Sequence, residues 1–527
     1  MSYSRRKFGA ILVGTGLALG EAGRRVLAHF ESLGSAELSA RRDDAVVGYP
    51  VRLIDRKPHA AWSAAPGDTI HFALTATKAG AQRLRMLSVG GREVHDFGAV
   101  FIPSQSFTSD APWLNGAGYQ PTVEWQIPAD LASGVYFLNG APELFVIVRT
   151  MGEQEPTSAA ISALPTAVLI PTNTINAYSV TLGRSCYNQP KRVPIVSFQR
   201  PMGASRAQQW IETAKWLDAE PLLLGARYIS DYDLEDPAAL KGIKMLIVAG
   251  HSEYWSRTAR ERFDAFVRDG GNALIASGNA MYWQIRYEED GERLVAYKFL
   301  NPEYGKDPAT DPLLVTTEWH RPGLHMPTVD SIGGDFIHGG FGSRRRGLGV
   351  TGTGLRVADP RHPLFSGQDL APCAVLDFCG VLEYDGAPIK GLDATGLPVA
   401  DPSVMNAYRL EIIAYEWGQR GGSTLATAHV YQRERDGGVV LHLGSPEATD
   451  RVSAAGCVVM RAVAREFARR LIAGETVFSA RPPADVVYPM HTPWKGHIPR
   501  LDDHCGPPPS TAAAPNSAAP LEVIGLR

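Results

Sequence analysis

The stretch IKMLIVAGHSEYWSR, residues 243–257, constrains the fold more than any other part of this 527-residue chain. Residues 245–249 form an unbroken apolar run, which is typical of a strand buried on both faces of a parallel sheet. Gly250 ends the run, and His251 and Glu253 follow before the next helix. If the chain stays extended past Gly250, these two side chains project the same way, at the edge where open α/β sheets bind ligands. The alternative to a ligand site is that this His and Glu are simply hydrogen-bonded within a polar loop and have no functional role.

The segments around this stretch alternate between strand and helix patterns. Such alternation implies right-handed βαβ crossovers and a parallel sheet. We expect an α/β domain over residues 160–480, with a loop-rich insertion near residues 300–370 that is rich in Gly, Pro and His. The expected strands are 167–170, 227–230, 273–276 and 439–443, and the expected helices are 206–219 (N-cap Ser205), 257–269 and 457–473.

Residues 45–150 show the pattern of an all-β domain instead. Short alternating segments are separated by Gly and Pro turns, which predicts an immunoglobulin-like or jelly-roll β-sandwich. No catalytic cluster is apparent there, so a scaffold or binding role is expected. The clearest of these segments are 69–74, 123–127, 134–138 and 144–148.

The N-terminal segment, residues 1–40, resembles an export signal. The run Ser4-Arg5-Arg6-Lys7-Phe8 precedes a weakly apolar stretch, as in bacterial twin-arginine signals. That stretch is too short to span a bilayer, so we expect export to the periplasm and no stable membrane insertion. The alternative is an amphipathic helix on a cytoplasmic protein. At the other end, residues 483–527 form a Pro/Ala-rich tail.

Charge and cysteine content exclude several functional classes. The 52 basic and 55 acidic residues give a net charge of −3, which gives no reason to expect nucleic acid or an anionic membrane as partner. The five cysteines have no zinc spacing and indicate no disulfide scaffold. The Gly-rich basic run GGFGSRRR, residues 339–346, lacks the phosphate-loop pattern.

Polar and aromatic clusters follow three of the apolar strands. PTNTINAY and SCYN come after residue 170, GHSEYW after residue 249, and SGNAMYWQ after residue 276. Neighbouring parallel strands bring their carboxyl ends to one edge of the sheet, so we expect the three clusters to meet in one crevice. A purely structural explanation would require three separate coincidences.

The ordered motifs PTNTINAYS, SCYNQP, SFQRP, GHSEYWS, GGNALIASGN and MYWQIR resemble the catalytic subunit of N,N-dimethylformamidase and its relatives, and the resemblance covers residues 165–473. The resemblance implies a glutamine-amidotransferase-like α/β domain, preceded here by the β-sandwich. It also implies a mononuclear ferric iron held by two tyrosines and one glutamate, which by motif are Tyr178, Tyr187 and Glu253. His251 and Asn279, Lys298 in AYKFL, and Glu383 in GVLEYD resemble further pocket residues.

The implied chemistry is hydrolysis of small or linear amide C–N bonds by water activated on the iron. Three anionic oxygens suit a hard trivalent cation, whose charge drives both phenols to ionise. Glu383 is the candidate general base that passes the proton of water to the leaving amine, and Asn279 and His251 are candidate donors to the oxyanion.

This chain also departs from the family pattern. The family's studied members have a longer catalytic chain with a lectin-like domain, and a separate small helical subunit. The shorter N-terminal region here leaves a partner subunit and a homo-oligomer open. Tyr178 and Tyr187 are closer together in sequence than in those enzymes, so the second tyrosine ligand is the less secure.

Two other readings remain. Ser252 in GHSEY nearly matches the nucleophile elbow G-x-S-x-G, although Tyr254 occupies a position that normally holds a small residue. Alternatively, the domain has lost its chemistry and binds a sugar or peptide. Cys186 and Cys379 are not in elbow contexts, which argues against a cysteine glutaminase.

Overall fold

The computed structural model describes residues 46–152, 164–187, 191–203, 208–223, 225–298, 306–342, 354–401, 403–405, 407–420, 423–480 and 485–489. Several predicted features lie outside these residues: the export signal, the N-cap Ser205, the basic run at residues 344–346 and most of the Pro/Ala-rich tail. No helix of the described part is long and apolar enough to cross a membrane.

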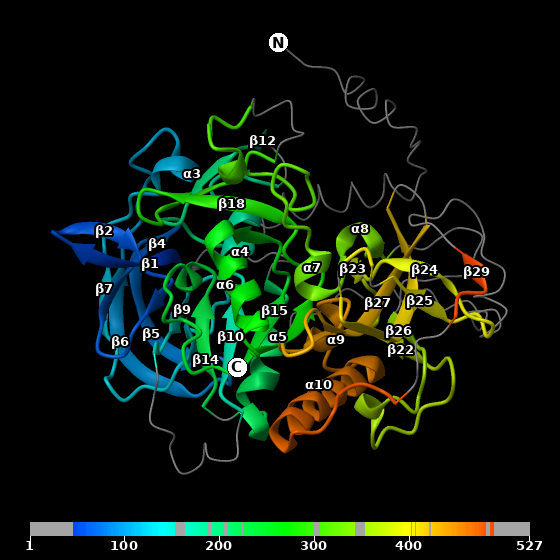
Figure 1. Ribbon diagram of the computed structural model, residues 1–527. Coiled ribbons are helices and arrows are strands. Elements are labelled where there is room, and N and C mark those ends of the chain that lie inside the picture. Colours follow the sequence, from blue (N-terminus) through cyan, green and yellow to red (C-terminus); the bar gives the residue numbers. More distant parts are fainter. Residues whose placement is uncertain are drawn as a thin grey trace, which may run out of the picture.

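The N-terminal region forms two sheets that face each other, as the alternating pattern predicted for a β-rich region. Their shared core holds side chains such as Phe72, Leu84, Trp125 and Val146. The sheets lie at the left of Figure 1, in blue and cyan. One has the order β2 (Lys57–Ala60), β1 (Val46–Ile54), β4 (Thr69–Ala76), β7 (Val123–Gln126); the other has the order β3 (Ser63–Ala64), β9 (Phe145–Val148), β8 (Gly134–Leu138), β5 (Gly80–Ser88), β6 (Glu93–Ile102); a short helix, α3 (Pro112–Asn115), adjoins them.

The central sheet is mixed, and the expectation of a parallel sheet is correct for only one half of it. Five strands run parallel: β14 (Arg227–Ser230), β10 (Thr166–Ile170), β15 (Met245–Gly250), β17 (Asn272–Ser277) and β28 (Val440–His442). The sheet continues antiparallel through β27 (Ser423–Gln432), β26 (Arg409–Gln419), β20 (Gly340–Phe341) and β23 (Glu383–Gly386). Strand β21 (Gly354–Val357) also pairs with β26, and β22 (Val375–Asp377) pairs with β21. Only three residues of the chain separate β26 from β27, a connection that antiparallel strands allow and parallel strands do not. The fold is therefore mixed α/β and rich in β structure.

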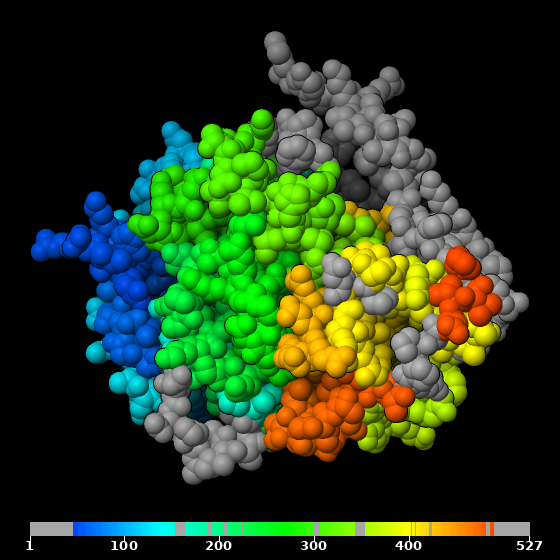
Figure 2. Space-filling model, in the orientation of Figure 1, coloured from blue at the N-terminus to red at the C-terminus, as the bar shows by residue number. Residues whose placement is uncertain are grey.

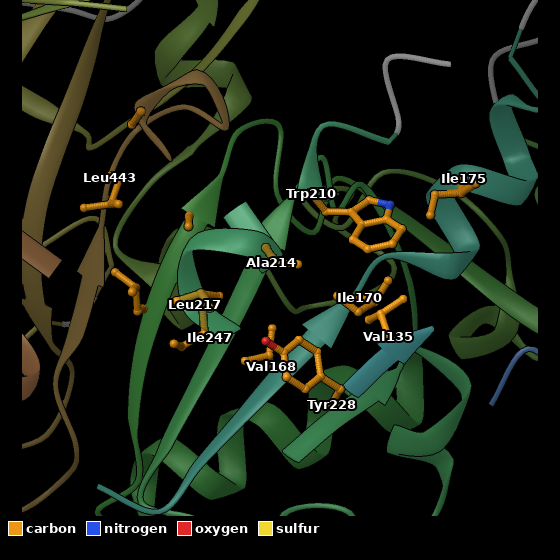
Figure 3. Packing of buried hydrophobic residues seen from close by; sticks show 14 of the residues in the cluster. Val135, Val168, Ile170, Ile175, Trp210, Ala214, Leu217, Tyr228, Ile247 and Leu443 are labelled. Atoms are coloured by element: carbon orange, nitrogen blue, oxygen red, sulfur yellow. The ribbon is translucent and has the colours of Figure 1, made fainter. Parts of the chain in front are cut away.

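Helices on both faces explain why residues 245–249 carry no polar side chain. Ile247 faces a core that also contains Trp210 of α5 (Trp210–Asp218) and Phe467 of α10 (Ala455–Ala473). Val248 faces the opposite core, with Phe263 of α6 (Arg257–Arg268). Because successive strand residues point to opposite faces, every position of the run is buried. Figure 3 shows Ile247, Val168, Ile170 and Tyr228 meeting the α5 residues Trp210, Ala214 and Leu217.

The β-rich region packs on helix α5 and on β14, the edge strand of this sheet. Phe137 and Phe145 contact Trp210, with ring centroids 6.0 and 5.3 Å apart. The space-filling view shows the blue N-terminal strands in contact with the green central part, and orange α10 below (Figure 2). The two regions therefore share one hydrophobic core.

Only short elements occur elsewhere, including the described parts of the predicted insertion. Cys373 takes part in a disulfide bond, which the cysteine spacing did not predict. The remaining elements are α4 (Thr172–Tyr178), β11 (Arg184–Ser185), β12 (Lys191–Arg192), β13 (Ile195–Ser197), β16 (Tyr254–Ser256), β18 (Trp283–Glu288), β19 (Arg293–Val295), α7 (Val329–Ile332), α8 (Phe336–Gly339), β24 (Ile389–Leu392), β25 (Pro398–Ala400), α9 (Glu447–Asp450) and β29 (Tyr488–Pro489).

Gly250, at the end of β15, is a position where we expect a side chain to be strongly destabilising. Its φ is +68°, and an added Cβ would lie 2.6 Å from the backbone nitrogen of Trp210. Left-handed strain of about 1–2 kcal/mol and overpacking of about 1–3 kcal/mol together predict that Gly250→Ala lowers the free energy of unfolding by about 2–5 kcal/mol.

Gly270→Ala is the matched control, measured by denaturant unfolding. Gly270 also has a left-handed φ, +92°, but nothing lies within 4 Å of its added Cβ. We therefore expect only the strain contribution of about 1–2 kcal/mol from this variant. Equal destabilisation by the two substitutions would show that the contact with Trp210 contributes nothing.

Candidate active site

The predicted polar clusters meet at the carboxyl edge of the parallel half of the sheet. The cluster after β10 folds into α4, which ends at Tyr178, and was not predicted to be helical. The first turn of α4 is held by Asp231, whose Oδ2 accepts a hydrogen bond from the Asn173 backbone nitrogen at 2.8 Å. At its other end, Arg200 Nε donates to Asn176 Oδ1 at 2.8 Å. Both ends of the helix that carries Tyr178 are thus fixed by buried charged side chains.

The loop after β15 places the second cluster, although not by the predicted route. The chain does not stay extended past Gly250, because the positive φ of that residue turns it. His251 and Glu253 converge nevertheless: His251 Nε2 lies 3.4 Å from Glu253 Oε2. Residues 251–253 belong to neither β15 nor β16 (Tyr254–Ser256), and the two side chains meet beyond the turn at Gly250.

The side chains of Tyr178, Glu253 and Glu383 gather around Nε2 of His251. The Tyr178 hydroxyl donates to Glu253 Oε2 at 2.7 Å and lies 3.2 Å from His251 Nε2. The same His251 nitrogen is 3.4 Å from Glu383 Oε2, at the start of β23. Glu253, His251 and Glu383 are only 2%, 4% and 5% exposed, so these charges interact in a largely water-free environment.

The other predicted residues border this group. Asn279 has a φ of +51°, and its side chain hydrogen-bonds to Glu383. The ring of Tyr187 stacks on that of Tyr178, with centroids 4.3 Å apart and an angle of 17° between planes. Lys298 Nζ lies 5.1 Å from the Tyr187 ring centroid. All seven predicted side chains therefore lie in one neighbourhood, and their individual roles remain predictions.

Burial and mutual charge separate the pKa values of the two acids. Burial acts to raise the pKa of Glu253, but the hydrogen bond to His251 and the charge of Lys298 hold it below its ordinary value. Burial also raises the pKa of Glu383, to about 7, and the nearby Glu253 adds to this. One carboxyl is thus kept ionised while the other titrates near neutrality, a pattern that suits different roles in acid–base chemistry.

The bases and phenol in the cluster are shifted as well. Burial acts to lower the pKa of His251, but Glu383 and Glu253 outweigh it and raise this pKa to about 9. Burial lowers the pKa of Lys298 to about 8. Burial, followed by the charge of Glu253, raises the pKa of Tyr178 well above its ordinary value. His251 Nδ1 lies 2.9 Å from the Gly278 carbonyl oxygen and so carries a proton.

Sequence reasoning assigned no role to three residues at this edge, although Trp283 stood in the predicted SGNAMYWQ cluster. Trp283 donates its indole N–H to Glu253 Oε1 at 2.8 Å. Asp385, two residues after Glu383, accepts from the Ala280 backbone nitrogen at 3.0 Å and pairs with His442 at 3.1 Å. Glu447 follows β28 in a fourth strand-end cluster, GSPE. The apolar strand before GSPE was recognisable, so applying the strand-end rule a fourth time would have found it.

Ser252 does not have the surroundings of a nucleophile. Its hydroxyl accepts a hydrogen bond from Trp255 Nε1 at 3.0 Å, and the residue is 1% exposed. The neighbouring base, His251, instead contacts Tyr178, Glu253 and Glu383. The geometry gives no support to the serine hydrolase reading.

The donor set fits a hard cation in its chemistry. Among the described residues, no group of three or more His, Cys, Asp or Glu side chains is arranged to hold a metal. The predicted set differs in kind, since it draws on two phenols and one carboxylate. Two of its oxygens, from Tyr178 and Glu253, are 2.7 Å apart, and Glu383 Oε2 beside them accepts no hydrogen bond from any described residue. Phenolate and carboxylate oxygens are hard donors, which hard cations prefer.

Comparison with known proteins gives a family match and several structural matches. A family model described as N,N-dimethylformamidase beta subunit-like, C-terminal, matches residues 89–447. No curated protein matches the chain. A solved thua-like protein from Bacteroides uniformis is similar over 60% of this chain and 95% of its own, with 11% identity and a TM-score of 0.30.

Proposed function

The chain belongs to the N,N-dimethylformamidase beta subunit-like family, whose model covers more than half of it, and from this premise we propose that it hydrolyses the C–N bond of small or linear amides. One observation carries the proposal: Tyr178, His251, Glu253 and Glu383 converge at the carboxyl edge of the sheet. An amidohydrolase needs an ionised group, a titrating carboxyl and hydrogen-bond donors within reach of one carbonyl, and this cluster offers all of them.

We propose further that Tyr178, Tyr187 and Glu253 hold a mononuclear ferric ion. When bound, such an ion supplies Lewis-acid polarisation of a carbonyl and acidification of water. The high pKa of Tyr178 is a property of the metal-free cluster, because a nearby cation favours the phenolate. Placing a cation here also offsets the buried negative charge of Glu253.

The chain's own residues then divide the proton transfers. Glu383, once deprotonated, takes a proton from the attacking water and returns it to the departing amine nitrogen, so that acid and amine leave as products. His251 and Asn279 donate hydrogen bonds to the carbonyl oxygen as it gains negative charge, each worth up to about 3–4 kcal/mol. The stacked Tyr178 and Tyr187 rings provide an apolar wall beside these groups.

The direct test is amine and formate release from N,N-dimethylformamide by the purified chain, with iron content and visible absorption measured on the same sample. Tyrosinate bound to ferric ion gives a coloured charge-transfer band. Folded protein that binds iron but cleaves no amide in a panel would remove the enzymatic proposal. Folded protein that binds no iron would remove the cofactor.

The pH dependence of kcat/KM is expected to be bell-shaped. Glu383 acts as a base only when deprotonated, so activity rises with pH through its pKa, which is about 7 in the metal-free cluster and which a bound cation lowers. His251 donates through Nε2 only while protonated, so activity falls as pH rises through its pKa, which is about 9 in the metal-free cluster and which a bound cation also lowers. The limbs belong to the coupled pair rather than to either residue alone. Glu383→Gln should remove the acidic limb and His251→Gln the basic one; a wild-type profile without an acidic limb would exclude Glu383 as the base.

A further inference from the structure

Trp283 is joined to Glu253 at both backbone and side chain. As the first residue of β18, it pairs with Tyr254 of β16, and its backbone nitrogen donates to the Glu253 carbonyl oxygen at 2.9 Å. Its indole Nε1–H donates to Glu253 Oε1 at 2.8 Å. The contact is therefore set by strand pairing and does not depend on a mobile side chain finding its partner.

The two oxygens of the Glu253 carboxylate have different partners. Oε1 accepts from Trp283, whereas Oε2 accepts from Tyr178 at 2.7 Å and lies 3.4 Å from His251 Nε2. An indole nitrogen only donates, so Trp283 favours an ionised acceptor and cannot exchange roles with it. Rotating the carboxylate would break the bonds on both oxygens.

The indole ring is itself held in place. Lys298 Nζ lies over its face, 4.9 Å from the ring centroid, and Tyr282 meets it edge to face at 4.9 Å. A cation over an indole face is attracted by the ring quadrupole. A side chain that orients another must first be fixed itself, and these contacts satisfy that condition.

We propose that Trp283 is a positioning residue that holds one oxygen of Glu253 and so reserves the other for the site. This inference rests on the proposed function for the role of Glu253. A carboxylate held in this way offers one oxygen to a cation, which leaves more of the cation's coordination sphere for substrate and water than a two-oxygen contact would.

The positioning role is tested without metal or substrate by the indole proton resonances of the full chain, purified without added metal. The ten tryptophans give few signals, and loss of one in Trp283→Phe assigns it. Hydrogen bonds to an ionised acceptor are about twice as strong as neutral ones. We therefore expect Glu253→Gln to move the Trp283 indole proton upfield and to speed its exchange with solvent.

Glu383→Gln is the control for this measurement, because that buried acid contacts His251 and not the indole. We expect the Trp283 indole proton to keep its position in this variant. No response to Glu253→Gln, or an equal response to both substitutions, overturns the proposal whatever the metal content of the protein.

A second measurement titrates the full chain with ferric citrate and determines bound iron. Outer-shell partners of metal ligands typically contribute 10- to 100-fold to affinity, so Trp283→Phe is expected to bind iron weaker by about that factor. Trp283→His, which keeps a ring N–H, should lose less. Trp255→Phe is the matched control: it also removes a hydrogen-bonded indole donor, but one whose partner is Ser252 and not Glu253. We expect its affinity for iron to be unchanged.

The two measurements separate the two proposals. Equal iron affinity in Trp283→Phe and wild type overturns the positioning role at the metal. If wild type binds no iron while the indole proton still responds to Glu253→Gln, the ferric cofactor fails and the orientation of Glu253 by Trp283 stands.

Discussion

Tyr178→Phe is expected to weaken the visible tyrosinate–iron band, because Tyr187 is then the one phenolate of the proposed set, and to lower both iron affinity and kcat/KM by more than about 100-fold. The hydroxyl is the shared contact of the cluster, at 2.7 Å from Glu253 Oε2 and 3.2 Å from His251 Nε2. Loss of an outer-shell partner already weakens metal sites about 10- to 100-fold, so loss of a direct ligand should exceed that range. Bound iron, absorption and amide hydrolysis are measured on one preparation.

Tyr431→Phe is the control for this substitution. Tyr431 is fully buried, and its hydroxyl donates to the Asp330 carbonyl oxygen at 2.7 Å, in the other hydrophobic core. We expect the control to keep its iron, colour and activity. A Tyr178→Phe protein with unchanged iron affinity and an unchanged band for each bound iron would exclude Tyr178 as a ligand.

Glu383→Gln is expected to separate binding from chemistry. Glutamine keeps the size of the side chain but cannot take a proton, so kcat should fall about 10²- to 10⁴-fold, the usual contribution of a general base. Iron binding should survive, because the proposed ligands are other residues. Steady-state kinetics and iron content together check the expectation.

Glu220→Gln serves as the control for loss of a buried carboxylate. Glu220 is 4% exposed and pairs with Arg465 at 2.9 Å, remote from His251. Its replacement should affect stability but leave kcat unchanged. If Glu383→Gln keeps full kcat, another group takes the proton.

The sequence predicted those parts of the fold that depend on local burial. The apolar run before Gly250 must be a strand between two layers, and residues 227–230, predicted as a strand, form β14. The antiparallel half was not foreseen, because its strands carry no helix between them to mark their direction.

The site shows the same division between local and distant information. Polar residues after apolar strands predicted which side chains gather, since strand ends in a parallel sheet share an edge. The contacts of Trp283 and Asp385 with the site were missed, because they depend on register and side-chain direction across elements distant in sequence. The turn at Gly250 was missed because glycine adopts positive and negative φ about equally readily, so the residue type alone does not predict its φ.

Because Phe137 and Phe145 pack on Trp210, the β-rich region and the α/β region cannot be separated without exposing part of their shared core. A fragment beginning at residue 164 would expose the indole of Trp210 to water and leave Glu292 without the His59 and Ala60 partners that it has at 3.1 and 3.0 Å. The β-rich region is thus not an accessory that evolution or an engineer could exchange freely. Any replacement would have to supply aromatic side chains that pack on Trp210 of α5 as Phe137 and Phe145 do.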